Sequence, residues 1–202
     1  MTIAEVQTAR KWVLAVAIWI SVLMFALTGS RLEYGIGFDD LIEWAGVAAI
    51  VICIVGRTWC SLYIGGRKIE QFVTVGPYSV MRNPLYFFSI VGAVGVGAQH
   101  GSVVAAAVFG VFAWLVFYFV VLQEEALLAD RYGAAFANYK VSVPRFLPNP
   151  GLWHDEPTLT IMPPKVIRTF ADAMFFLLPI PLADGLEHLQ HIGMLPVLFR
   201  LP

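Results

Sequence analysis

The segment VVAAAVFGVFAWLVFYFVVL forms residues 103–122, and none of its side chains is charged. An α-helix of about 20 apolar residues is long enough to cross the ~30 Å hydrocarbon core of a bilayer. Apolar residues make up 59% of the 202-residue chain and charged residues 13%, whereas a soluble domain has about 25% charged residues. The composition therefore excludes a soluble globular enzyme, a disordered chain and a disulfide scaffold, and it indicates an integral membrane protein.

Three more apolar segments, residues 12–29, 41–64 and 84–98, are predicted to span the membrane. The segment 84–98 is short, so it must tilt little, thin the bilayer or lie partly within protein. A secretory signal is the alternative for the first segment, but no small-residue cleavage site follows it. We therefore expect an all-α integral membrane protein, a polytopic helical bundle with four transmembrane helices.

Basic residues are distributed unevenly between the two predicted faces of the membrane. They precede the first span and follow the second and fourth, whereas the loop 99–102 has no Lys or Arg. Cytoplasmic loops carry the excess of Lys and Arg in membrane proteins. We therefore expect the N-terminus, residues 65–83 and everything after Leu122 in the cytoplasm, and the protein in the inner membrane if its source is bacterial.

Residues 1–150 are predicted to form the transmembrane core, in which residues 123–150 are a cytoplasmic segment that closes a cytoplasmic-side pocket. Residues 151–202 begin with a proline-rich segment and continue into apolar or interfacial helices. The apolar stretch 166–182 contains Arg168 and Asp172, which favour an interfacial helix over a fifth span. It is a candidate fifth membrane-embedded or re-entrant C-terminal helix, and the topology of residues 151–202 is open.

Charged residues within or beside a membrane are costly, so they are candidate functional residues. The short loop 99–102 makes the third and fourth spans an antiparallel hairpin, which brings Arg82 close to Glu124 and Glu125. Acidic residues at the C-terminal end of a helix oppose its dipole, which favours a functional role for the two carboxylates. Arg57, near the end of the second span, is interpreted as a snorkelling anchor.

Several motifs follow one another in the second half of this core. Gly76-Pro77-Tyr78-x-x-x-Arg82-Asn83-Pro84-x-Tyr86 comes first, then Glu124-Glu125, and then Tyr132-Gly133, Tyr139, Val143-Pro144-Arg145 and Pro148. In this order and spacing they resemble the motifs of the isoprenylcysteine carboxyl methyltransferase and phospholipid methyltransferase superfamily. The resemblance covers roughly residues 50–150.

The resemblance implies a polytopic enzyme that takes a methyl group from S-adenosylmethionine and releases S-adenosylhomocysteine. It implies catalytic roles for Arg82, Glu124, Glu125 and Arg145. It implies cofactor contacts for Tyr78, Arg82, Asn83, Tyr86, Gly95, Gly97, Glu124, Glu125 and Tyr139. From the spacing of Gly92, Gly95 and Gly97 alone, close helix packing is the favoured interpretation.

The resemblance also implies a methyl acceptor that is a carboxylate, amine or thiol of a lipid-like or lipidated substrate entering from the membrane. An NADPH-dependent membrane sterol or lipid reductase is the alternative, because such reductases carry a similar Arg-(His/Asn)-Pro-x-Tyr pattern. A non-enzymatic relative is a third hypothesis. We expect no metal site and no nucleic-acid partner, and the oligomeric state is open.

Overall fold

The computed structural model describes residues 28–30, 37–65, 72–195 and 199–201. Apart from residues 28 and 29, the predicted first span lies outside the described residues. The helices are α2 (Phe38–Ile64), α3 (Pro77–Val80), α4 (Pro84–Ala98), α5 (Val103–Ser142), α6 (Pro163–Met174) and α7 (Pro179–His191), with 3₁₀ turns η1 (Pro150–Leu152) and η2 (Phe175–Leu177). The fold is helical as predicted, with one addition: β1 (Thr28–Ser30) and β2 (Phe199–Leu201) form a short parallel pair.

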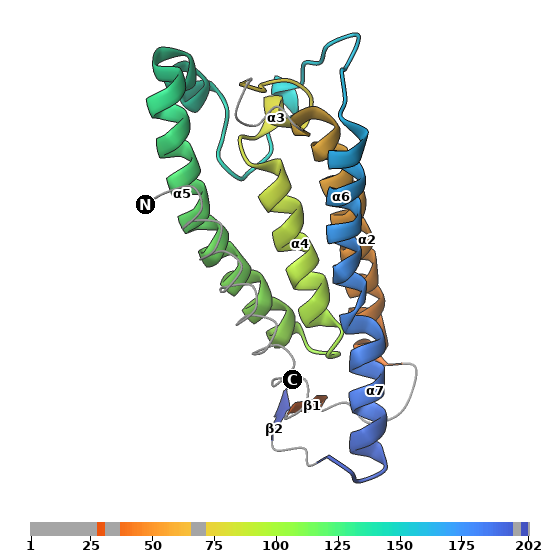
Figure 1. The fold of residues 1–202 in the computed structure, drawn as a ribbon. Helices are drawn as coiled ribbons and strands as arrows, with labels where there is room; N and C mark the ends of the chain where they lie inside the picture. Colours follow the sequence, from red (N-terminus) through yellow and green to blue (C-terminus); the bar gives the residue numbers. More distant parts are fainter. Residues whose placement is uncertain (1–27, 31–36, 66–71, 196–198, 202) are drawn as a thin grey trace.

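The long helices form a bundle in which α4 packs between α2 and α5, and α6 packs on α2 (Figure 1). By length and composition, three described stretches can cross a membrane: Asp40–Ile64, Val103–Ser142 and Pro163–Gln190. Helix α4 is apolar but has only 15 residues, which is short of the length that a span needs. Of the predicted spans that lie within the described residues, the structure therefore supports 41–64 and 103–122 but not 84–98, and it adds Pro163–Gln190.

Glycines allow α4 to approach both of its neighbours closely. A Cβ atom on Gly95 would lie 2.6 Å from the Gly46 carbonyl oxygen of α2, and one on Gly97 would lie 2.6 Å from the Ala105 carbonyl oxygen of α5. A Cβ atom on Gly92 would lie 2.5 Å from Cys53 Sγ. The glycines thus permit backbone contact between helices, which supports the packing interpretation.

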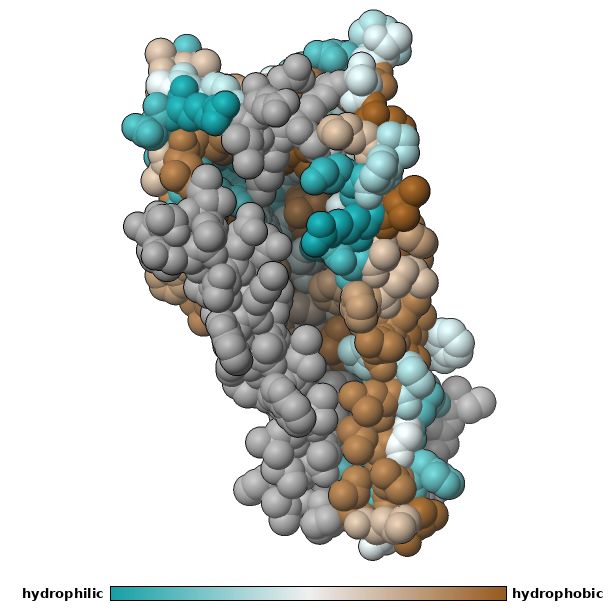
Figure 2. Space-filling view, in the orientation of Figure 1, coloured by the Kyte–Doolittle hydropathy of each residue, from teal (hydrophilic) through white to brown (hydrophobic). Residues whose placement is uncertain are grey.

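The C-terminal helices differ from the favoured sequence interpretation of an interfacial or re-entrant segment. Together α6, η2 and α7 are long and apolar enough to span; α6 and η2 pack on α2, and α7 continues beyond them (Figure 1). Pro179 and Pro181 fall in the first turn of α7, where a proline removes no helical hydrogen bond. The prolines therefore do not end this helical stretch, and in Figure 2 its lower part shows many apolar residues, with hydrophilic residues along one side.

Helix α5 continues well beyond the predicted end of its span at Leu122. At Gly133 the backbone takes φ 50° and ψ −119°, which breaks the helical path. A residue with a side chain rarely adopts this conformation. The turn brings Phe136 and Tyr139 back against Phe72, where they form a buried aromatic cluster.

Candidate active site

A cavity is lined by residues of α3, of the beginning of α4 and of α5. These elements meet at the end of the bundle where α5 diverges from α4 (Figure 1). The cavity has about 610 Å³ of empty space, a figure that includes space open to solvent. Its polar lining comes from Tyr78, Arg82, Asn83, Tyr86, Glu124 and Tyr139, and its apolar lining from Ile64, Phe72, Val73, Leu85 and Leu128.

A cluster of charged side chains borders this cavity, with Glu125 at its centre. Arg145 donates two hydrogen bonds to Glu125, from Nε to Oε1 at 3.1 Å and from Nη2 to Oε2 at 2.8 Å. Arg82 Nε lies 3.2 Å from Glu125 Oε1. Glu125 is only 6% exposed, so it is largely shielded from water. The two arginine cations compensate its negative charge in this buried position. The hydrogen bonds with Glu125 raise the pKa of Arg145 further above its ordinary value.

The adjacent carboxylate, Glu124, has a different environment. It lines the cavity, and its Oε1 accepts a hydrogen bond of 2.7 Å from the Tyr86 hydroxyl. The Tyr86 ring packs on Phe117 of α5, with 5.0 Å between the ring centroids. Two neighbouring residues of one helix therefore present one carboxylate to the cavity and one to a pair of arginines.

The segment 143–156 holds the α3 region in place through backbone hydrogen bonds. The amide of Arg82 donates to the Pro144 carbonyl at 2.8 Å, and the amide of Gly76 donates to the His154 carbonyl at 2.9 Å. Gly76 has φ 59° and a Cβ there would clash with the Tyr63 ring. The glycine of the Gly-Pro-Tyr motif is therefore required by both its backbone conformation and its close contact.

Side-chain hydrogen bonds tie the same parts together. The Tyr139 hydroxyl donates to the Tyr78 carbonyl at 2.6 Å, and Asn83 Nδ2 donates to the Arg145 carbonyl at 3.3 Å. Arg82 Nη1 donates to the Lys140 carbonyl at 2.5 Å. These bonds join α3, the beginning of α4, the end of α5 and the segment 143–156 around one cavity.

The predicted site residues fall into two groups. Those that line the cavity or adjoin it through the ion pairs are Tyr78, Arg82, Asn83, Tyr86, Glu124, Glu125, Tyr139 and Arg145. Gly95 and Gly97 instead lie near the other end of α4, against α2 and α5. They are not among the residues that line the cavity.

Phe72 is a cavity residue that sequence reasoning missed. Its ring stacks on Tyr132 at 5.2 Å and meets Tyr139 edge-on at 5.0 Å. Phe72 lies in a loop without a recognisable motif, so the sequence gives no signal for it. Its contact with Tyr139 depends on the return of the chain after Gly133.

Arg57 does not act as the outward snorkelling anchor that the sequence suggests. Its guanidinium donates to Ser89 Oγ of α4, and its Cζ lies 5.9 Å from the centre of the Phe176 ring. The sequence interpretation is wrong because α4 supplies a polar partner inside the bundle, which periodicity alone does not reveal.

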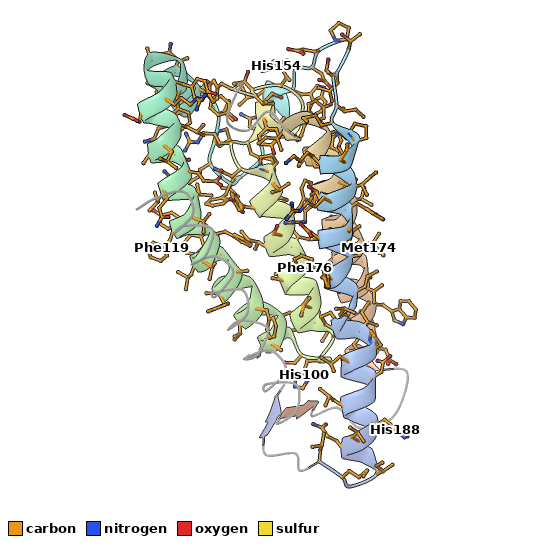
Figure 3. All side chains as sticks on the ribbon, in the orientation of Figure 1. His100, Phe119, His154, Met174, Phe176 and His188 are labelled. Atoms are coloured by element: carbon orange, nitrogen blue, oxygen red, sulfur yellow. The ribbon has the colours of Figure 1, made fainter. Side chains whose placement is uncertain are left out.

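Among the described residues, no group of three or more His, Cys, Asp or Glu side chains is placed to hold a metal ion. Figure 3 shows His154 at the α3 end of the bundle, whereas His100 and His188 lie toward the other end.

Comparisons with known proteins give a family match and several relatives. A model of the phospholipid methyltransferase family matches residues 44–135. The nickel-cobalt-cadmium resistance protein NccN of Alcaligenes xylosoxydans xylosoxydans is 34% identical over 191 residues, which are 93% of this chain and 89% of that protein. The cobalt-zinc-cadmium resistance protein CzcN of Cupriavidus metallidurans is 34% identical over 167 residues, 80% of this chain and 76% of that protein.

A more distant match is the protein-S-isoprenylcysteine O-methyltransferase of Schizosaccharomyces pombe, 30% identical over 114 residues, 56% of this chain and 48% of that protein. No solved structure matches the chain. The reductase alternative finds no support in these matches. The chain therefore belongs to one family with NccN and CzcN, and the family model and the isoprenylcysteine methyltransferase match support its place in the isoprenylcysteine carboxyl methyltransferase and phospholipid methyltransferase superfamily.

Proposed function

We propose that the protein is a membrane methyltransferase that uses S-adenosylmethionine and methylates a carboxylate, amine or thiol of a lipid-like or lipidated substrate. The observation that carries the proposal is the cavity between α4 and α5, to which the family motifs contribute Arg82, Asn83, Tyr86 and Glu124. When bound, S-adenosylmethionine would supply an electrophilic methyl group on a sulfonium.

The donor set fits such a cofactor. Glu124 offers negative charge toward an ammonium or sulfonium, and Arg82 offers positive charge toward a carboxylate. Aromatic and aliphatic side chains, among them Phe72 and Leu128, form an apolar wall for a planar base. A cavity of this composition can hold a zwitterionic ligand with an aromatic part.

The two carboxylates would have separate roles in this proposal. Glu124 faces the cavity and is the candidate proton acceptor for an amine substrate, directly or through water. Glu125 orients Arg82 and Arg145, and thereby the loop that forms the cavity wall. Methyl transfer between aligned atoms gains most from positioning and from exclusion of water, which a rigid ion cluster supports.

We also propose that the α3 end of the bundle faces the cytoplasm. Arg82, Arg131, Lys140 and Arg145 belong to this end, which agrees with the positive-inside rule. In this orientation the cofactor would reach the cavity from water, while the substrate would reach it from the bilayer.

Calorimetry on the detergent-purified protein tests the proposal. S-adenosylmethionine and S-adenosylhomocysteine should bind with micromolar dissociation constants, and Glu124→Gln should weaken binding by about tenfold because a charged contact is lost. Asp130→Asn, an exposed residue of the same helix, is the matched control and should bind normally. Absence of binding to either ligand, in protein shown to be folded, would overturn the proposal.

A second proposal rests on the two relatives that are named as metal resistance proteins. We propose that methyl transfer by this chain contributes to resistance against divalent metal ions. A strain that depends on the chain for growth in cobalt should lose resistance with Glu124→Gln and keep it with Asp130→Asn. If the two variants give equal resistance, the resistance does not depend on Glu124 and the cavity, which would contradict this second proposal.

A further inference from the structure

The short helix α3 belongs to the cavity wall but is too short to hold its own position. It has four residues, Pro77–Val80, whereas isolated helices of fewer than about 12–15 residues are marginal in water. Tyr78 in this helix and Arg82 just after it line the cavity. The positions of these two side chains therefore depend on the contacts that other parts of the protein make with residues 76–82.

Different parts of the chain hold the two ends of this stretch. At one end, the amide of Arg82 donates to the Pro144 carbonyl at 2.8 Å. At the other end, the amide of Gly76 donates to the His154 carbonyl at 2.9 Å. The amide of His154 donates in turn to Ser79 Oγ at 3.2 Å. The backbone of His154 is thus paired with the beginning of the stretch.

The side chains on either side of His154 contact the end of α2. The Tyr63 hydroxyl donates to Asp155 Oδ2 at 2.7 Å, and the Trp153 ring stacks on Trp59 with 5.7 Å between the centroids. Residues four apart, such as Trp59 and Tyr63, share one face of a helix. Residues 153–155 therefore join α2, through their side chains, to residues 76–79, through their backbone.

Tyr63 also contacts the stretch directly. A Cβ atom on Gly76 would clash with the Tyr63 ring, so the ring packs against the glycine. Tyr63 is 8% exposed and shares a buried cluster with Tyr78. Tyr63 and Asp155 are not among the residues that line the cavity. Their influence on a ligand must therefore pass through residues 76–79.

We infer that Tyr63 and Asp155 are positioning residues for the cavity. Their hydrogen bond fixes residues 153–155 on α2, and these residues fix the backbone on which Tyr78 lies. A hydrogen bond to a carboxylate is stronger than one between neutral groups, which suits this role. Both residues lie outside the motifs that predicted the site, and the family model ends at residue 135, before Asp155. The consequence for ligand affinity rests on the proposed function.

Calorimetry with S-adenosylhomocysteine on the detergent-purified protein measures that consequence. Tyr63→Phe and Asp155→Ala should each weaken binding about fivefold, roughly the effect of one hydrogen bond. The double variant should bind no more weakly than the single variants, because both changes remove the same contact. The matched control Glu156→Ala removes the adjacent exposed acidic side chain and should bind like the wild type. Unchanged affinity of both single variants, or additive losses in the double variant, would overturn the inference.

Hydrogen exchange of the ligand-free protein, measured by mass spectrometry, tests the positioning without a ligand. Tyr63→Phe should speed exchange about fivefold in residues 76–81, while residues 85–98 exchange as in the wild type. Equal acceleration in both segments would show a general structural role and would overturn the inference, as would unchanged exchange in residues 76–81.

A second variant covers the case in which Tyr63→Phe does not fold. Asp155 is exposed, so Asp155→Ala should fold and should give the same exchange pattern. If the wild type binds no adenosyl ligand, the proposed function fails, and the exchange pattern still decides whether Tyr63 and Asp155 position residues 76–81.

Discussion

Glu124 and Glu125 are consecutive residues with opposite surroundings, and this difference arises from the helix that carries them. Successive residues of an α-helix point about 100° apart, so one carboxylate can face the cavity while the other faces Arg145. Sequence reasoning identified both and could not divide their roles. The division follows from the partners, because Tyr86 bonds to Glu124 and two arginines surround Glu125.

The charge of Glu125 should be essential for stability. Glu125→Gln leaves Arg82 and Arg145 without a counter-ion in a largely buried cluster, which costs about 3 kcal/mol in typical proteins. Thermal unfolding in detergent should therefore show a large decrease in the unfolding temperature. Asp130→Asn, exposed on the same helix, should change little. A Glu125→Gln variant as stable as the wild type would show that the ion pairs contribute nothing to folding.

At the scale of single elements, α4 combines two tasks that the sequence alone does not separate. Its first turn supplies Leu85 and Tyr86 to the cavity, and its later glycines bring it into contact with α2 and α5. The motif residues and the glycines are close in sequence, but a helix rises about 1.5 Å per residue. Gly95 therefore lies more than one helical turn from Tyr86, on the part of α4 that packs.

Gly95→Ala tests the packing role. The new methyl group would lie against the Gly46 carbonyl, and such overpacking costs about 1–3 kcal/mol. We expect a lower unfolding temperature and, in the protein that remains folded, unchanged affinity for S-adenosylhomocysteine. Gly185→Ala in α7 has nothing within 4 Å of the new atom and should be neutral or slightly stabilising. Lost affinity at full stability would instead place Gly95 in the site.

Gly133 controls the last part of α5. An alanine would fit the open space there, but the backbone conformation at φ 50° and ψ −119° costs a residue with a side chain about 1–3 kcal/mol. Gly133→Ala should therefore weaken the packing of Phe136 and Tyr139 on Phe72. We expect faster hydrogen exchange in residues 134–142, measured by mass spectrometry, while α2 and α4 stay protected. Unchanged exchange in that segment would argue against a hinge at Gly133.

At the scale of the whole molecule, the C-terminal helices complete the bundle. Ala173 is fully buried against Ile50 and Ile54 of α2, next to Phe176. The charges of Arg168 and Asp172 are on exposed residues of α6, so the same helix presents an apolar seam and a polar face. Sequence reasoning gave weight to the two charges, whereas in the structure the small residue Ala173, which lies between Asp172 and η2, packs on α2.

Ala173→Leu tests whether α6 must pack closely on α2. A leucine does not fit a fully buried alanine position, and overpacking of this kind costs about 1–3 kcal/mol. The unfolding temperature should fall, whereas Ala171→Leu, at an exposed position of the same helix, should leave it nearly unchanged. Similar stability of the two variants would show that α6 contributes little to the bundle.

Composition and apolar length were sufficient to predict a helical membrane protein, because a chain with so few charges cannot cover a soluble surface. The positions of α2 and α4 followed from the same apolar runs, and the motif residues around Arg82 and Glu124 were recognisable from their order. What depended on the tertiary structure was which side chains meet: the inward turn of Arg57, the entry of Phe72 into the cavity, and the place of Gly95 in packing. These contacts join segments far apart in the chain. Their energies depend on how the segments pack in three dimensions, which a local sequence pattern does not determine.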